Sequence, residues 1–206
     1  SGYTFRTAAI LREQRALGWE TFHLTSPKQG KAAAEVEDVD GLRFYRCPVP
    51  EAGPAGINEL RLMRATEARL EQLARELKPD VLHAHSPVLN AIPAIRVGKR
   101  LGIPVVYEIR AFWEDAAVDH GTTAEGSIRY RATRAMETWA LKRVDHAFTI
   151  CEGLRVDIVA RGIPAAKVTV IPNAVDTEGF QLSGDPDSEL RRQLGLADCT
   201  TVGFVG

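Results

Sequence analysis

The stretch from residue 79 to residue 115 constrains the fold of this chain more than any other. It holds two short apolar runs, residues 80–83 and 103–109, on either side of a segment of helix-forming composition. A strand, a helix and a second strand within this length predict two parallel strands joined by a right-handed crossover. Ligands of open parallel sheets bind beyond the carboxyl ends of the strands, so we expect the polar residues after each run to mark a site.

Strands and helices alternate along most of the chain, which predicts an α/β fold with a Rossmann-like, doubly wound parallel sheet. Three segments, residues 26–40, 48–56 and 116–123, are polar or contain glycine and proline, and we expect loops there. Pro93 cannot donate a backbone hydrogen bond, so a break is predicted in its helix. Helices are predicted from the first turn to residue 18 and at residues 57–77, 88–101, 127–144, 152–161 and 188–194, and further strands at residues 19–25, 41–47, 145–150, 167–171 and 200–206.

Composition and charge exclude several classes of protein. The chain has 26 Lys and Arg residues against 27 Asp and Glu residues, so no strong field favours nucleic acid or an anionic membrane. Cys47, Cys151 and Cys199 lie far apart, which predicts free thiols in a cytoplasmic protein and neither a disulfide framework nor a metal site. No apolar run approaches the roughly 20 residues of a membrane-spanning helix, and no signal peptide is recognisable.

Both ends of the sequence indicate a fragment of a longer protein. The chain opens at Ser1 in loop-like residues, and it closes on a strand-like TTVGFVG with nothing after it. A helix that follows a Ser-Gly turn normally has a strand before it, so we expect the first strand of the domain to be missing.

Two histidines follow the first apolar run. His83 and His85 are two residues apart, so they would share a face if the strand ran through both. We expect the strand to end between them, so that only one needs to face the crevice. A lone histidine is more often structural than functional, and zinc is disfavoured because no third ligand stands at a readable spacing. No metal site is therefore expected.

Glu108 and Arg110 are placed in the same way at the end of the second run. A carboxylate beside a guanidinium can orient a sugar hydroxyl or hold a phosphate, and the alternative is an ion pair that only caps the strand end. Phe112 and Trp113 follow at once. Their rings suit the apolar patches of a sugar, or they belong to the core.

Three weaker candidates lie elsewhere. Gly2 stands in a turn at a helix N-terminus, which either binds an anion or is an ordinary turn. Asn173 directly follows a strand, in IPNAVD, where it can bond the backbone across a hinge, reach into a crevice or simply form a turn. Arg131 and Arg134 share a helix face, away from Arg129, which indicates a solvated surface or a contact for phosphate or lipid headgroups.

Taken in order, the segments DVLHAHSP, PVVYEIRAFWED, TICEGLRVDIVARGI and KVTVIPNAVDTEGF resemble the N-terminal half of a glycosyltransferase family 4 enzyme. That family has the GT-B architecture of two facing Rossmann-like domains. The resemblance covers nearly the whole chain and is strongest in DVLHAH and in IPNAVD with Phe180. It implies that residues 1–180 are the acceptor-side domain, truncated at its start, and that residues 181–206 are a linker and the first strand of the donor-binding domain.

The resemblance implies retaining transfer of a sugar from a nucleotide-sugar donor to a glycan or lipid-linked acceptor, in bacterial-type polysaccharide or glycolipid assembly. No metal or other cofactor is implied. The donor-binding groups of the family, a basic pair and a Glu-x7-Glu motif, belong to the second domain, so we expect this chain alone to be inactive. The implied location is cytoplasmic, with peripheral contact at the inner face of the membrane as an option.

The resemblance also sets the candidate site. Many relatives carry a histidine where this chain has Arg110, and Arg110 is a poor general base because it stays protonated. Ala174 stands where glycine is commonest. A nucleotide-sugar epimerase of the same fold and a non-catalytic Rossmann-like binding domain remain alternatives, whereas a dinucleotide oxidoreductase is disfavoured because no Gly-x-Gly-x-x-Gly follows a strand. The expected catalytic residues are Arg110, Glu108 and His85, and the expected substrate-binding residues are Gly2, Tyr3, Trp113 and Asn173.

Overall fold

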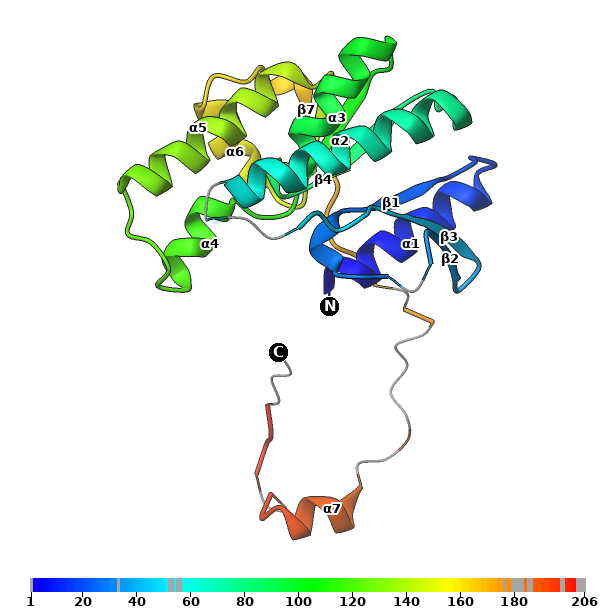
Figure 1. Cartoon of the computed structure of the whole chain (residues 1–206). Helices are drawn as coiled ribbons and strands as arrows, with labels where there is room; N and C mark the ends of the chain where they lie inside the picture. The colour runs from blue at the N-terminus through cyan, green and yellow to red at the C-terminus, as the bar shows by residue number, and fades with distance from the viewer. Residues whose placement is uncertain are drawn as a thin grey trace. The chain divides into compact units, whose positions relative to one another are not determined.

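The chain divides into two compact units, Ser1–Asn173 and Ala174–Gly206 (Figure 1). The computed structural model describes residues 2–32, 34–51, 54, 57–175, 177–178, 184, 187–196 and 199–202. Among the helices described, none is long and apolar enough to cross a bilayer.

A four-stranded parallel sheet forms the centre of the first unit. Its strands β4 (Leu82–His85), β5 (Val105–Ile109), β6 (His146–Thr149) and β7 (Val168–Val170) lie side by side in chain order. All three neighbouring pairs are parallel. The predicted α/β fold with a parallel sheet is therefore confirmed, and the carboxyl ends of β4 and β5 meet at one edge.

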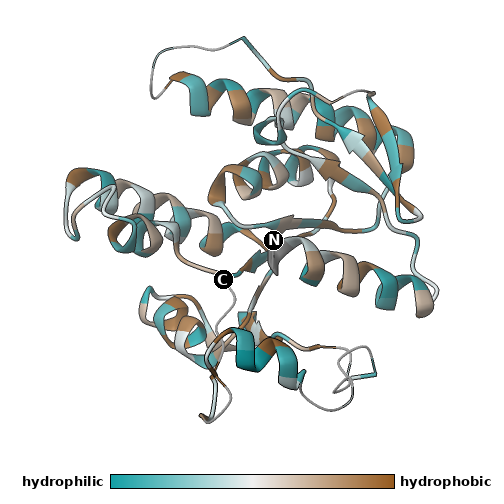
Figure 2. Ribbon diagram, turned by 90° about the horizontal axis from the view of Figure 1, so that it is seen from below, coloured by the Kyte–Doolittle hydropathy of each residue, from teal (hydrophilic) through white to brown (hydrophobic). Residues whose placement is uncertain are grey.

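The helices that connect these strands supply much of the core. They are α3 (Val88–Leu101), α5 (Ile128–Arg143) and α6 (Glu152–Ala160), the last followed by a short 3-10 turn, η2 (Ala165–Lys167). Figure 2 shows hydrophobic and hydrophilic residues alternating in bands along the helices, as expected for helices with one side against a core. Ala91, Val97, Tyr107, Ile109, Ala140, Leu141 and Ile158 are fully buried.

Two predictions about helices are wrong. The break at Pro93 does not occur: α3 runs on from Val88 to Leu101 with the buried Pro93 inside it, at the cost of the hydrogen bond that a residue with an N–H would donate there. The loop expected at residues 116–123 is partly helical: α4 (Trp113–Asp119) begins soon after β5, with Glu114 and Asp115 in its first turn, where carboxylates favour a helix.

The N-terminal part of the unit contains α1 (Gly2–Ala16) and a second, three-stranded sheet. This sheet has the order β1 (His23–Thr25), β3 (Leu42–Arg46), β2 (Val36–Val39), with β1 parallel and β2 antiparallel to β3. The strand predicted at residues 19–25 is thus confined to its last three residues.

The loop predicted at residues 26–40 is wrong at Val36–Val39, which form β2, whereas the described residues from 26 to 35 contain no strand or α-helix. Asp40 and Gly41 both have positive φ, 52° and 75°, which is the backbone of a two-residue hairpin turn. This Asp-Gly turn folds β2 back onto β3 and is the signal that the sequence offered. A 3-10 turn, η1 (Pro27–Gln29), occupies part of the remaining stretch.

The long helix α2 (Ile57–Leu77) has the bounds predicted for it. In the second unit, α7 (Ser188–Gln193) confirms the predicted short helix, and the Asp187 carboxylate caps it by accepting from the Leu190 N–H. The strand predicted at residues 200–206 is absent from residues 200–202, and residues 203–206 lie outside the described part of the chain, as do Phe180 and the expected boundary there.

Candidate active site

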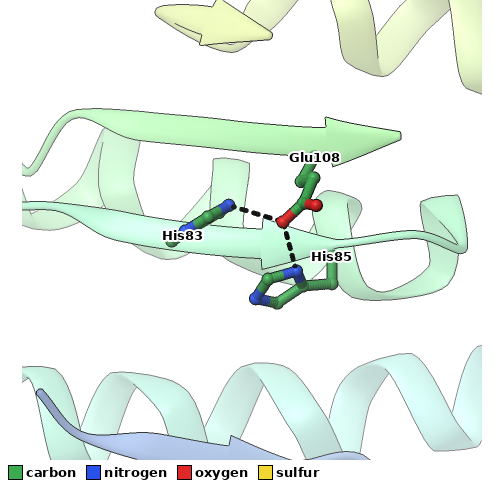
Figure 3. Close-up of side chains that lie close together, drawn as sticks. All are labelled: His83, His85 and Glu108. Carbon is green, nitrogen blue, oxygen red and sulfur yellow. Dashed lines mark ion pairs between the residues drawn. The ribbon is translucent and has the colours of Figure 1, made fainter. Parts of the chain in front are cut away.

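Both histidines of the DVLHAH segment lie on β4 and face Glu108 on the neighbouring strand (Figure 3). His85 is the direct register partner of Glu108. The two imidazole rings stack with centroids 4.4 Å apart and an interplanar angle of 29°. The expectation that the strand ends between the histidines is therefore wrong: β4 runs through His85, so the two side chains share a face.

Glu108 is the centre of this cluster, and its residue surface is 1% exposed. Its Oε2 lies 3.0 Å from His85 Nδ1 and 3.5 Å from His83 Nε2. Its Oε1 accepts hydrogen bonds from Arg6 Nε at 2.8 Å and from Arg110 Nε at 3.1 Å. Burial alone would raise the pKa of Glu108, but the hydrogen bonds from His85, Arg110 and Arg6 outweigh burial and hold that pKa well below its usual range. Glu108 is therefore a carboxylate at neutral pH.

Arg110 is held tightly beside Glu108. Besides the carboxylate, its guanidinium donates from Nη2 to Thr7 Oγ1 at 3.0 Å and lies 3.0 Å from His85 Nδ1. The backbone N–H of Arg110 points to Ser86 Oγ at 3.4 Å. Arg110 is 7% exposed. The three residues expected to be catalytic thus lie together, but two of them, Arg110 and Glu108, are almost fully buried.

His85 is the most exposed member of the cluster, with 32% of its side-chain surface open against 26% for His83. Its Nδ1 lies 3.0 Å from both Glu108 Oε2 and Arg110 Nη2. A carboxylate only accepts and a guanidinium only donates, so Nδ1 carries a proton in the first pairing and a lone pair in the second. In neutral His85, Nε2 is an acceptor when Nδ1 donates to Glu108, and it is a donor when Nδ1 accepts from Arg110. Nε2 has no hydrogen-bond partner among the described residues.

His83 is kept neutral by its surroundings. Burial, followed by the neighbouring His85, lowers the pKa of His83 to about 4. Its Nε2 is buried and has no hydrogen-bond partner among the residues the structure describes. His83 therefore contributes an uncharged imidazole ring beside His85 and Glu108.

His83, His85 and Glu108 also have the chemistry of a metal-ligand set, with one ligand atom each and all three within 4.8 Å of one another. Two fixed positive charges argue against a metal, because Arg6 and Arg110 both bond the same carboxylate. A pair of like unit charges about 4 Å apart repels by about 4 kcal/mol at an effective dielectric of about 20, and a divalent ion doubles this. The arrangement fits a hydroxyl or an anion better than a cation.

Arg6 is the site residue that the sequence reasoning missed. It lies on α1, and its side chain is 11% exposed. Beyond Glu108, it donates to the carbonyl oxygens of Ile171 and Pro172 at 2.8 and 2.9 Å and to Asn173 Oδ1 at 3.2 Å. Nothing in the sequence separates Arg6 from other arginines of the same helix, since its partners lie more than 100 residues away.

The remaining expected site residues lie as follows. Trp113 is the first residue of α4 and is 44% exposed, with no hydrogen bond or ring contact to the cluster among the described residues. Asn173 is exposed and reaches the cluster through Arg6. Gly2 and Tyr3 lie in the first turn of α1, and the Tyr3 side chain is outside what the structure describes. Phe112 belongs to the core, beneath the Arg161 guanidinium at 3.6 Å.

Known structures share this fold. Sucrose-phosphate synthase from Thermosynechococcus elongatus superposes with a TM-score of 0.63 at 15% identity, over 88% of this chain and 44% of that one. Anabaena HepE in complex with UDP and glucose gives a TM-score of 0.52 at 19% identity, over 77% of this chain and 38% of that one. At these identities the likeness shows the fold alone, which is that of a GT-B half.

Sequence comparison gives the family. A curated relative, the sulfoquinovosyl transferase SQD2 of Arabidopsis thaliana, is 27% identical over 106 residues, which is 52% of this chain and 19% of that protein. Residues 1–174 match the family described as glycosyl transferase 4-like domain. This match covers both strands of the cluster, the helix that carries Arg6 and the segment that Arg6 binds. The chain belongs to the glycosyl transferase 4-like domain family.

Proposed function

We propose that this chain is the acceptor-binding half of a retaining glycosyltransferase, which moves a sugar from a nucleotide-sugar donor to a glycan or lipid-linked acceptor. The observation that carries the proposal is the cluster of His85, Glu108 and Arg110 at the carboxyl ends of β4 and β5, in a chain of the glycosyl transferase 4-like domain family. Ligands of parallel sheets bind at this edge. HepE, which shares the fold, was crystallised with UDP and glucose.

In this proposal His85 touches the substrate. Its exposed side can present Nε2 to a sugar hydroxyl, as an acceptor when Glu108 holds the Nδ1 proton. Glu108 fixes the ring, in the way that a carboxylate orients a histidine base. Arg110 adds a permanent positive charge to the same edge, which favours the negative charge that develops on a departing nucleotide.

Further substrate contacts come from the other expected residues. The exposed indole of Trp113 offers a flat apolar face to a sugar ring. Asn173 and the backbone N–H groups of Gly2 and Tyr3 at the start of α1 supply polar contacts. The reaction uses no metal or other cofactor, and the nucleotide sugar is bound mainly by a second domain, so this chain alone does not turn over.

The proposed place of action is the cytoplasm, at the inner face of the membrane. The support is a groove of about 900 Å³ along α5, whose lining includes Arg131, Arg134, Lys142 and Arg143 and no acidic residue. Ile128 at its end is 88% exposed. A basic helix face with exposed apolar residues suits anionic headgroups. Flotation of the full-length protein should be stronger with vesicles that contain acidic phospholipid than with neutral vesicles. The double variant Arg131→Gln, Arg134→Gln should float less with the acidic vesicles. Equal flotation of wild type with both kinds of vesicle would contradict this location.

The catalytic proposal is tested on the full-length protein with UDP-glucose, UDP-N-acetylglucosamine and GDP-mannose as donors and a polyprenyl-phosphate-linked sugar as acceptor. Acceptor-dependent release of nucleotide, with the anomeric configuration kept in the product by NMR, is the expected result. His85→Asn should lower kcat/KM by about tenfold to a hundredfold, because a hydrogen bond to a reacting group is lost.

The matched control is His120→Asn. His120 follows α4, is exposed, and its ring contacts only the Ala116 carbonyl among the described residues, so this variant should keep wild-type turnover. Equal kcat/KM for His85→Asn and wild type would remove His85 from the mechanism. Donor binding without any transfer would point to the binding-domain alternative.

A further inference from the structure

Arg6 connects the candidate site to the place where the chain leaves the first unit. Its Nε donates to Glu108 Oε1 at 2.8 Å on one side. On the other side, Nη2 donates to the Ile171 carbonyl at 2.8 Å, and Nη1 donates to the Pro172 carbonyl at 2.9 Å and to Asn173 Oδ1 at 3.2 Å. Four donor–acceptor contacts of one guanidinium are thus divided between the centre of the cluster and three consecutive residues.

These three residues have little other support in the described part of the chain. β7 ends at Val170, and the Ile171 N–H makes the last bond to the sheet, to the Thr149 carbonyl at 2.7 Å. Pro172 has no N–H to donate, and the side chain of Asn173 is exposed. The first unit ends at Asn173. Beyond the last sheet bond, the path of the chain exit is therefore held by Arg6.

The hold depends on charge. A guanidinium that is 11% exposed needs an acceptor of opposite charge nearby, and Glu108 supplies it. If the Glu108 carboxylate is neutralised or drawn toward a ligand, Arg6 loses that partner and its bonds to residues 171–173 weaken. Any such coupling is reciprocal, so a change at the exit also acts on the cluster.

We propose that Arg6 is a positioning residue that couples the Glu108 cluster to the chain exit at residues 171–173. Ligand binding to the cluster would then change the order of the segment that leads into the second unit. The inference stands on the contacts of Arg6 and does not depend on which reaction the site performs.

Hydrogen–deuterium exchange on the full-length protein tests the coupling. At the Ile171 amide, whose N–H bonds the Thr149 carbonyl, Arg6→Gln should exchange about tenfold faster than wild type, whereas peptides from α3 and β6 should not change. Arg12→Gln is the matched control, because Arg12 is an exposed arginine of the same helix. Wild-type exchange at the Ile171 amide in Arg6→Gln would overturn the proposal.

A double-mutant cycle separates coupling from simple anchoring. Glu108→Gln alone should also speed exchange at the Ile171 amide, and adding it to Arg6→Gln should have no further effect there. Additive effects of the two substitutions would show that Glu108 acts on the exit independently of Arg6, which overturns the coupling.

The test does not depend on the Arg6 variant being folded. Asn173→Ala removes only the contact to Nη1 at an exposed position, and it should speed exchange at the Ile171 amide, by less than Arg6→Gln does. Unchanged exchange in Asn173→Ala together with unchanged exchange in Glu108→Gln would also contradict the proposal.

Discussion

His85 stands directly opposite Glu108 in the register of β4 and β5, and its Nδ1 lies 3.0 Å from Glu108 Oε2. Because the strands fix this pairing through the backbone ladder, the imidazole and the carboxylate remain together without help from a loop. The sheet therefore fixes the backbone positions from which the two side chains meet, and such a fixed support is what a substrate-orienting group needs.

Glu108→Gln should destabilise the first unit by about 3–5 kcal/mol, because it leaves the guanidinium groups of Arg6 and Arg110 buried without a counter-charge. Urea unfolding at pH 7 measures the loss. Glu13→Gln, at an exposed glutamate of α1, is the control and should stay within about 0.5 kcal/mol of wild type. A Glu108→Gln variant as stable as this control would show that the ion pairs contribute nothing.

The same residue predicts a direction of pH dependence. The folded-state pKa of Glu108 is lowered, so its stabilising effect is complete above the pKa of about 4.3 expected for an unfolded glutamate, and it is lost as the pH falls below that value. Wild type should lose stability more steeply than Glu108→Gln between about pH 5 and pH 3. Thermal melts across this range provide the comparison, and parallel curves would contradict it.

Glu137 predicts the opposite slope near neutrality. It is buried on α5 and bonded to the Tyr107 hydroxyl at 2.6 Å, and burial raises its pKa to about 7. The stability that protonated Glu137 contributes is complete below the pKa of about 4.3 expected for an unfolded glutamate. It is lost as the pH rises through about 7, the pKa of the folded state. Stability should fall by about 3 kcal/mol between pH 5 and pH 8 from this group alone.

Glu137→Gln should abolish that fall, since an amide cannot titrate yet keeps an acceptor for Tyr107. The comparison is urea unfolding of the two proteins at pH 5, 6.5 and 8. If both lose stability equally between pH 5 and pH 8, Glu137 does not bind the proton.

Much of this fold follows from local sequence signals, and the exceptions have physical reasons. α2 and α3 have the predicted bounds because long helices depend on periodicity and on breakers such as Pro79 and Gly102. β2 was missed although its pairing rests on a two-residue turn at Asp40 and Gly41, which is itself a local signal for a hairpin. The sequence placed polar groups at the ends of two strands, but register and stacking are properties of the assembled sheet.

Arg6 shows the limit most clearly. Its bond to Glu108 spans 102 residues and its bond to Pro172 spans 166 residues. Side-chain contacts of that separation arise only when α1, β5 and the end of β7 have come together. A single sequence contains no local pattern for them, so the residue that joins the cluster to the chain exit was not predicted, whereas His85, Glu108 and Arg110 were.

Removal of metal should have no effect. EDTA should leave the proposed transfer reaction unchanged, and added Zn²⁺ should not raise the Tm of the protein, because Arg6 and Arg110 both bond the carboxylate that a metal would need. A Tm increase with Zn²⁺ that disappears in His83→Ala would show instead that His83, His85 and Glu108 bind metal.

If the proposed transfer is observed, Arg110→Ala should lower kcat/KM of the full-length protein by the equivalent of about 1.5–3 kcal/mol in transition-state binding, the cost of a lost charge-assisted contact. Arg110→Lys should recover little, because one ammonium cannot reach Thr7, His85 and Glu108 together. Steady-state kinetics of wild type, Arg110→Ala and Arg110→Lys measures the effect, with the assay temperature below the melting temperature of each protein. Unchanged kcat/KM in Arg110→Ala would remove Arg110 from the mechanism.

Gly98 fixes how closely α3 packs on the strand that carries Glu108. A Cβ at this position would overlap the Val105 side chain and lie 2.6 Å from the Ile103 carbonyl oxygen. The carbonyl is a backbone group, and β5 is paired with a strand on each side, so neither can shift easily to relieve the overlap. Gly98→Ala should therefore lower the free energy of unfolding by about 1–3 kcal/mol. Gly153→Ala in α6 is the matched control, because its nearest neighbour would be Cys151 Sγ at 3.9 Å, and alanine there should stabilise by up to about 1 kcal/mol. Urea unfolding should therefore move the two variants in opposite directions, and a shift of the same sign in both would mean that helix propensity, rather than contact with β5, decides the outcome at Gly98.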